Sequence, residues 1–126
     1  MLDKHGYIKL IDFGHAKEGI TDETKTYSLL GTPEYISPEV LMKEGYDKSI
    51  DFWSLGIILY EMVNGISPFF NESKINIYKN ILQEKLVMKS FFSSELCALL
   101  ERLLEKNVIY SQIKISRLKE CAISGK

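Results

Sequence analysis

Residues 31–39 read GTPEYISPE, and this stretch divides two very different parts of the chain. Before it, residues 14–36 show no apolar periodicity, and a loop of this length in a compact domain usually indicates either function or disorder. At its end, Ser37 is a good helix cap, Pro38 has no N–H to leave unpaired, and Glu39 suits the positive end of a helix dipole. We therefore predict a long loop followed by a helix that begins after Ser37.

Three more helices are predicted beyond this stretch. One covers residues 48–64 and stops at Gly65, and it is apolar on every side, which is typical of a helix in the centre of a larger protein. A further helix is predicted to begin at residues 71–73. The last helix is predicted to begin at residues 93–95, and its leucines recur every three or four residues. The pattern predicts a mainly α fold.

The N-terminal part carries a strand signal. Residues 6–11 are rich in branched and aromatic side chains and follow a turn signal, which favours a short strand leaving a β-hairpin. Asp12, Phe13 and Gly14 come directly after it.

Composition excludes several classes of protein. The formal charge of −1 gives no field that would attract nucleic acid. Cys97 and Cys121 lie far apart with no metal-binding spacing, and His5 and His15 look like ordinary loop histidines, so zinc and disulfide frameworks lack support. We expect no signal peptide, no membrane segment, and an intracellular, cytoplasmic location.

Three motifs occur in a fixed order: DFG at residues 12–14, GTPEYISPE at 31–39 and DFWSLG at 51–56. Together they closely resemble the protein kinase family, over residues 2–104. The segments YSLLGTPEY at residues 27–35 and KEGI at residues 17–20 are most similar to the AGC group of serine/threonine kinases, near protein kinase B and the cyclic-AMP-dependent kinase.

The resemblance implies a fold and an activity. Residues 1–107 would form part of a kinase C-terminal lobe, with a hairpin strand, an activation loop and a helical bundle but no N-lobe, and residues 108–126 a divergent tail. The implied reaction is ATP-dependent phosphorylation of protein serine or threonine. Asp12 would hold Mg²⁺ bound with ATP, since magnesium prefers carboxylate oxygen; by resemblance Phe13 would pack inside, and Gly14 would permit the turn.

A regulatory site is implied in the loop. Ser28 stands where AGC kinases carry the activation-loop phosphate, added by an upstream kinase, and Lys17 would be its partner because a phosphate needs basic side chains. Thr24 and Thr26 are the competing acceptors.

Peptide docking is implied around the second motif. Thr32, Pro33 and Tyr35 would belong to the substrate loop, with Thr32 supporting the catalytic aspartate of the family. Glu34 and Glu61 would meet arginine near the acceptor, because carboxylates pair well with guanidinium. An acid at the end of an apolar helix segment, as at Glu61, is costly unless something pairs with it.

Other residues are implied to be structural: Glu39, Asp51, Trp53 and Gly56. In the family, the glutamate that matches Glu39 pairs with a buried arginine. Ser111 stands where that arginine is expected, and Arg117 is the candidate for it if the chain carries an insertion. If Arg117 does not reach Glu39, a buried carboxylate is left without a partner.

The rest of the catalytic machinery has no match in these 126 residues. The glycine-rich loop, the N-lobe lysine and the catalytic aspartate are missing, so we expect the chain alone to be inactive and to fold poorly. The alternative function is a non-catalytic module that binds kinase substrates or regulators.

Overall fold

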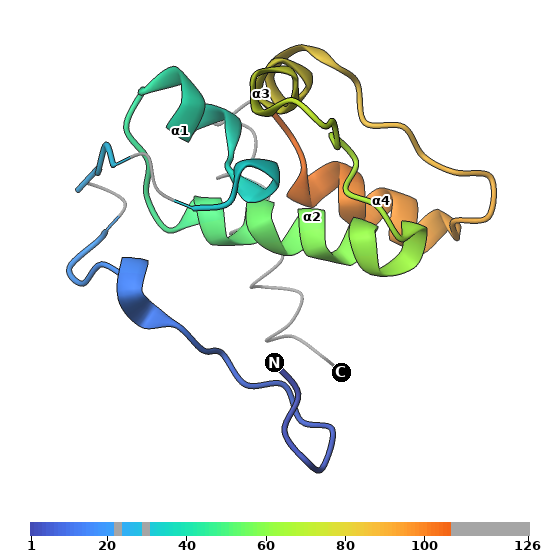
Figure 1. Ribbon diagram of the computed structural model, residues 1–126, viewed down its shortest axis with the longest axis horizontal. Coiled ribbons are helices and arrows are strands. Elements are labelled where there is room, and N and C mark those ends of the chain that lie inside the picture. Colours follow the sequence, from blue (N-terminus) through green and yellow to red (C-terminus); the bar gives the residue numbers. More distant parts are fainter. Residues whose placement is uncertain (22–23, 29–30, 107–126) are drawn as a thin grey trace.

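The computed structural model describes residues 1–21, 24–28 and 31–106, and this part is mainly helical (Figure 1). Its elements, in chain order, are the 3-10 helices η1 (Phe13–His15) and η2 (Pro33–Tyr35) and the α-helices α1 (Pro38–Met42), α2 (Ser49–Asn64), α3 (Lys74–Gln83) and α4 (Ser94–Leu103). The prediction of a mainly α chain is confirmed.

The helix boundaries follow the local signals in the sequence. Ser37 is the N-cap of α1, and α2 stops at Gly65, which adopts a φ of 84°. The Ser93 side chain accepts a hydrogen bond of 3.2 Å from the Leu96 N–H and so caps α4. These predicted starts and stops are confirmed within a residue or two.

One apolar core joins α2, α3 and α4. Trp53 of α2 stacks on Phe69 with ring centroids 6.0 Å apart, and Tyr60 meets Phe92 edge-on at 5.3 Å. The buried residues of this core are Trp53, Ile57, Tyr60, Phe69, Ile77, Ile81, Phe92, Leu100, Leu103 and Leu104. The core gives the C-terminal half of the described chain its own interior.

Gly56 of α2 packs against the C-terminal end of α4. A Cβ atom built on Gly56 would lie 2.8 Å from the Cβ of Leu103 and 2.8 Å from Cδ2 of Leu104. The glycine thus provides the space in which the two helices meet.

We expect Gly56→Ala to destabilise the fold, although alanine is the better helix former. The gain in helix propensity is about 1 kcal/mol. Overpacking costs about 1–3 kcal/mol, and the Leu103 Cβ cannot turn away because it is fixed to its backbone. Urea unfolding should therefore show a lower midpoint for the variant, whereas a higher midpoint would mean that the two helices separate readily.

The other side of α2 faces an apolar groove. The groove has a volume of about 300 Å³ and lies between α2 and α4; it is lined by Phe52, Leu55, Ile58, Leu59, Met62, Leu99 and Leu103. Leu55 is 52% exposed and Met62 is 78% exposed. The described residues therefore cover only one face of α2, which agrees with the prediction that this apolar helix is typical of the centre of a larger protein.

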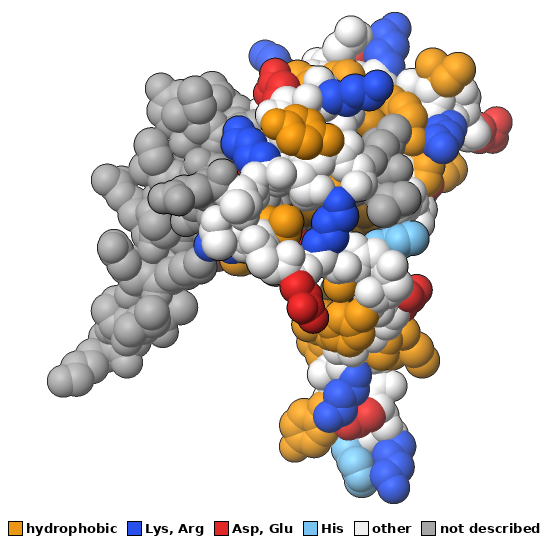
Figure 2. Space-filling view, turned by 90° about the vertical axis from the view of Figure 1, so that its left-hand side faces the viewer, with side chains coloured by type: hydrophobic (Ala, Val, Ile, Leu, Met, Phe, Trp, Pro, Cys, Tyr) orange, Lys and Arg blue, Asp and Glu red, His pale blue; other side chains and the backbone are white. Residues whose placement is uncertain are grey.

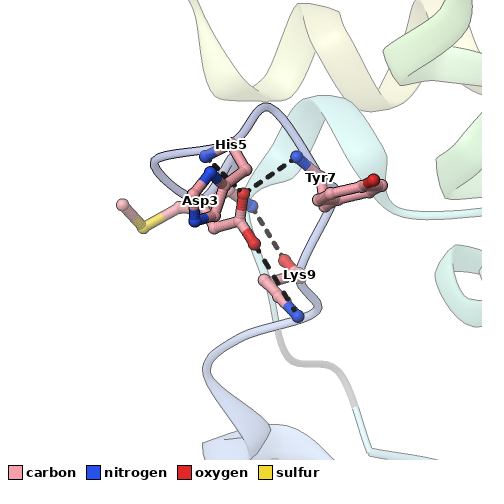
Figure 3. A network of polar contacts seen from close by, with 5 residues as sticks. Asp3, His5, Tyr7 and Lys9 are labelled. Atoms are coloured by element: carbon pink, nitrogen blue, oxygen red, sulfur yellow. Dashed lines mark hydrogen bonds and ion pairs between the residues drawn. The ribbon is translucent and has the colours of Figure 1, made fainter.

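The predicted strand over residues 6–11 is not formed. Only a minimal hairpin is present: a turn at residues 4–6 joins one antiparallel bridge between Leu2 and Ile8, flanked by the hydrogen bonds Asp3 N–H to Tyr7 carbonyl and Lys9 N–H to Met1 carbonyl. The Asp3 carboxylate accepts hydrogen bonds from the backbone N–H groups of His5 and Tyr7 at 2.9 and 3.0 Å, and Lys9 approaches it at 3.8 Å (Figure 3). A strand needs an extended partner, and the described chain supplies only this short turn.

The N-terminal segment projects from the helical body. Figure 1 shows it running below α2, and in Figure 2 the molecule narrows into the same projection. No helix in the part of the chain that the structure describes is long and apolar enough to cross a membrane.

Candidate functional site

The Asp12-Phe13-Gly14 motif lies on the projecting segment. Asp12 has a left-handed backbone, with φ 60°, and its carboxylate accepts a hydrogen bond of 3.3 Å from the Gly14 N–H. Both the Asp12 side chain and Phe13 are exposed, Phe13 by 69%. The expectation that Phe13 packs inside is wrong here, because residues 1–19 contribute no buried apolar side chain for it to pack against.

Lys17 lies between two hydroxyl groups of the loop that precedes Gly31. Its Nζ donates to Thr26 Oγ1 at 2.5 Å and to Ser28 Oγ at 2.6 Å. The structure thus brings together the acceptor and the basic partner that the sequence nominated, with Thr26 beside them. The neighbouring Thr24 faces elsewhere, since its hydroxyl donates to the Gly19 carbonyl at 3.0 Å.

Tyr35 and Glu61 join the substrate-loop candidates to α2. The Tyr35 hydroxyl donates to Glu61 Oε2 at 2.7 Å, and the Tyr35 carbonyl accepts from Ser54 Oγ at 3.1 Å. The hydrogen bond to Glu61, then burial and the nearby charges of Glu61 and Glu34, raise the pKa of Tyr35 to about 12. The phenol therefore stays a hydrogen-bond donor throughout the physiological pH range.

The remaining loop candidates surround this pair. Pro33 and Glu34 belong to η2 and are half-buried. Thr32 precedes η2 and is exposed. No hydrogen bond or ion pair within the described residues joins Asp12 to this loop. The metal candidate and the peptide-docking candidates are therefore separate in this structure.

Glu39 is buried in α1, with 6% of its surface exposed. Burial raises its pKa, and the charges of Asp47 and Glu44 raise it further, against opposing hydrogen bonds within α1's first turn. The described residues place no arginine or lysine within ion-pair distance of it. Ser111 and the candidate partner Arg117 lie outside the described residues, as does the predicted tail.

The other structural candidates divide between core and surface. Trp53 is in the core and Gly56 at the helix contact, as reported above, while Asp51 is exposed on the first turn of α2. Among the described residues no three His, Cys, Asp or Glu side chains are grouped as a metal centre would require.

Sequence reasoning missed Tyr46. This half-buried residue pairs with Thr26 through an antiparallel bridge and donates from its hydroxyl to the Ser28 carbonyl at 2.6 Å. The only local signal was an aromatic residue after Gly45, which does not indicate a partner some twenty residues earlier in the chain.

Comparison with known proteins agrees with the motifs. The family model described as the protein kinase domain matches residues 1–112. The human serine/threonine-protein kinase Sgk2 is 44% identical over 107 residues, which are 85% of this chain and 29% of that protein. The RAC family serine/threonine-protein kinase homolog of Dictyostelium discoideum is 45% identical over 108 residues, 85% of this chain and 24% of that one.

A third relative points the same way. The cAMP-dependent protein kinase type 3 of Saccharomyces cerevisiae is 44% identical over 108 residues, 86% of this chain and 26% of that protein. The chain thus spans about a quarter of the length of the curated relatives it matches. These relatives are AGC kinases, so the resemblance drawn from the motifs is confirmed. The chain belongs to the protein kinase domain family.

Proposed function

We propose that this part of a serine/threonine kinase domain docks a basic peptide segment and faces a metal-bound nucleotide through Asp12. The observation that carries the proposal is the hydrogen bond of 2.7 Å between Tyr35 and Glu61. It ties the loop after Thr32 to the last turn of α2, and it fixes one carboxylate oxygen of Glu61 beside that loop. An acidic side chain held in this way is a preorganised receptor for a cation.

Glu61 has the chemistry to bind a guanidinium group. It is half-buried, and no lysine or arginine among the described residues pairs with it. Tyr35 occupies Oε2 and is neutral, so the negative charge is not compensated. Arginine supplies a planar fork of donors that fits a carboxylate, which favours substrates with arginine near the acceptor serine or threonine.

Asp12 fits the role of a magnesium ligand. Mg²⁺ is usually held by one or two carboxylates together with the phosphates of its nucleotide and water. The Asp12 carboxylate is exposed, and one of its oxygens is held by the Gly14 N–H. When bound, the ion with ATP would neutralise charge on the transferring phosphoryl group, and Asp12 would orient it.

Ser28 is the proposed site of control by an upstream kinase. A phosphate there would replace the contact between the Lys17 ammonium and a neutral hydroxyl by an ion pair, and the Thr26 hydroxyl already accepts a hydrogen bond from the same ammonium group. The loop segment would then be held more firmly to Lys17.

We expect Glu61→Gln to weaken binding of an arginine-containing peptide about tenfold or more, because one charge-assisted hydrogen bond is lost. The measurement is fluorescence anisotropy with the full 126-residue chain and a labelled peptide carrying two arginines before its serine. Glu101→Gln is the matched control, since Glu101 is an exposed acid on α4.

Further arms separate the alternatives. Tyr35→Phe keeps the charge of Glu61 but frees its orientation, so we expect a smaller loss than for Glu61→Gln. Equal affinity for the peptide and for its arginine-to-alanine version would disprove docking at Glu61. Phosphate transfer from Mg²⁺-ATP to the peptide is measured alongside binding, and any transfer would rule out the alternative of a non-catalytic binding module.

A further inference from the structure

A short antiparallel contact joins residues 25–28 to the two residues Gly45 and Tyr46. The Thr26 N–H donates to the Tyr46 carbonyl at 2.9 Å, and the Tyr46 N–H donates to the Thr26 carbonyl at 3.0 Å. The Tyr46 hydroxyl adds a third bond, of 2.6 Å, to the Ser28 carbonyl. Tyr46 therefore makes three hydrogen bonds to this segment, two with the backbone of Thr26 and one with the carbonyl of Ser28.

Gly45 allows the loop segment to lie directly on the backbone. Gly45 is buried and has a φ of +77°, and a Cβ there would lie 2.9 Å from Cε1 of Tyr27 and 3.0 Å from Cδ of Lys25. Both the backbone conformation and the available space thus require glycine. The contact is packed as well as hydrogen-bonded.

The Tyr46 side of the contact is anchored on the helical body. The buried Asp47 follows it directly, and the Asp47 carboxylate accepts a hydrogen bond of 2.7 Å from the Ser49 N–H at the start of α2. The loop side has fewer supports, since residues 24–28 include no buried side chain. When the contact opens, the loop segment is the side that moves.

We propose that Tyr46 is a clamp: it holds residues 26–28 against the start of α2, and it must release them before Ser28 can be modified. An enzyme that acts on Ser28 needs access to the backbone around its hydroxyl, and here both the Ser28 carbonyl and the Thr26 backbone are engaged. Access is then set by the population of the locally opened state. The proposal rests on the proposed function only in taking Ser28 as the phosphate acceptor.

The substitution Tyr46→Phe removes the hydroxyl and keeps the ring and the backbone pair. Loss of one intramolecular hydrogen bond should raise the opened population about fivefold. Tyr60→Phe is a matched control, because the Tyr60 hydroxyl also donates to a backbone carbonyl, that of Val87 at 2.8 Å, but within the core.

The first test needs no upstream kinase. Trypsin cleavage after Lys25 and hydrogen exchange at the Thr26 amide are measured on the full chain. We expect both rates to rise about fivefold in Tyr46→Phe and to stay at the wild-type value in Tyr60→Phe. Gly45→Ala, which displaces Tyr27 and Lys25, should raise them too. Unchanged rates in Tyr46→Phe, or an equal rise in Tyr60→Phe, would overturn the clamp.

The second test reads the acceptor itself. The chain and the Tyr46→Phe variant are incubated with a eukaryotic cell extract and Mg²⁺-ATP, and phosphate on Ser28 is followed by mass spectrometry. Faster phosphorylation of the variant supports the clamp, and equal rates overturn it. If Ser28 is modified in neither chain, the part of the proposal that concerns modification of Ser28 fails, and the cleavage and exchange rates alone decide whether Tyr46 holds residues 26–28.

Discussion

Trp53→Ala is expected to lower the free energy of unfolding by about 3–5 kcal/mol, the usual cost of deleting a buried aromatic side chain. Trp53 is 3% exposed and stacks on Phe69, so its loss leaves a cavity between α2 and the segment before α3. Because domains of this size are stable by only about 5–15 kcal/mol, such a loss removes a large part of the total. Urea unfolding followed by circular dichroism gives the value.

Leu55→Ala is the matched control for this prediction. Leu55 lies two residues further along α2 but on the apolar groove, where it is 52% exposed. Its truncation should cost about 1 kcal/mol or less, since little burial is lost. A cost equal to that of Trp53→Ala would contradict the structure, because it would mean that both faces of α2 are buried in solution.

Glu39→Gln is expected to stabilise the chain by about 1–3 kcal/mol at any pH at which the buried Glu39 carboxyl is ionised, because a charge is then replaced by a neutral group of similar shape. Burial raises the pKa of Glu39 above its value in the unfolded chain. The contribution of this carboxyl to stability is therefore present at low pH and is lost as the pH rises through the folded-state pKa. The measurement is the difference in unfolding free energy between wild type and variant, followed from alkaline to acidic pH.

That difference should shrink as the pH falls, because the wild-type carboxyl becomes protonated while the glutamine does not titrate. The opposite result, a variant less stable at pH 7 by roughly 3–5 kcal/mol, would show that the carboxylate is paired with a cation. Arg117 is the residue that the sequence nominates for that pair.

Helix positions could be predicted because their signals are local. Ser93 and Gly65 act on the backbone within a few residues, and Ser37 stands at the N-cap of α1 although its side chain makes no capping hydrogen bond; each marks a boundary that the structure reproduces. The strand over residues 6–11 failed for the opposite reason. The described residues offer this segment a single bridge, between Leu2 and Ile8, and an isolated two-stranded hairpin is only marginally stable.

The candidate site was predictable as a set of residues but not as a set of contacts. Tyr35 and Glu61 were each nominated for substrate binding, yet their mutual hydrogen bond spans 26 positions and has no sequence signature. Phe13 was expected inside by resemblance, although burial depends on neighbours that the described chain does not provide. Tyr46 was not nominated, since its role comes entirely from tertiary contact.

The apolar groove between α2 and α4 has a consequence for handling the purified chain. Water next to its leucine, isoleucine and methionine side chains is displaced whenever two molecules meet there, and this gain scales with the area covered. Association through such a surface grows stronger in ammonium sulfate, whereas association between opposite charges is screened by salt. We therefore expect the chain to aggregate least at low ionic strength.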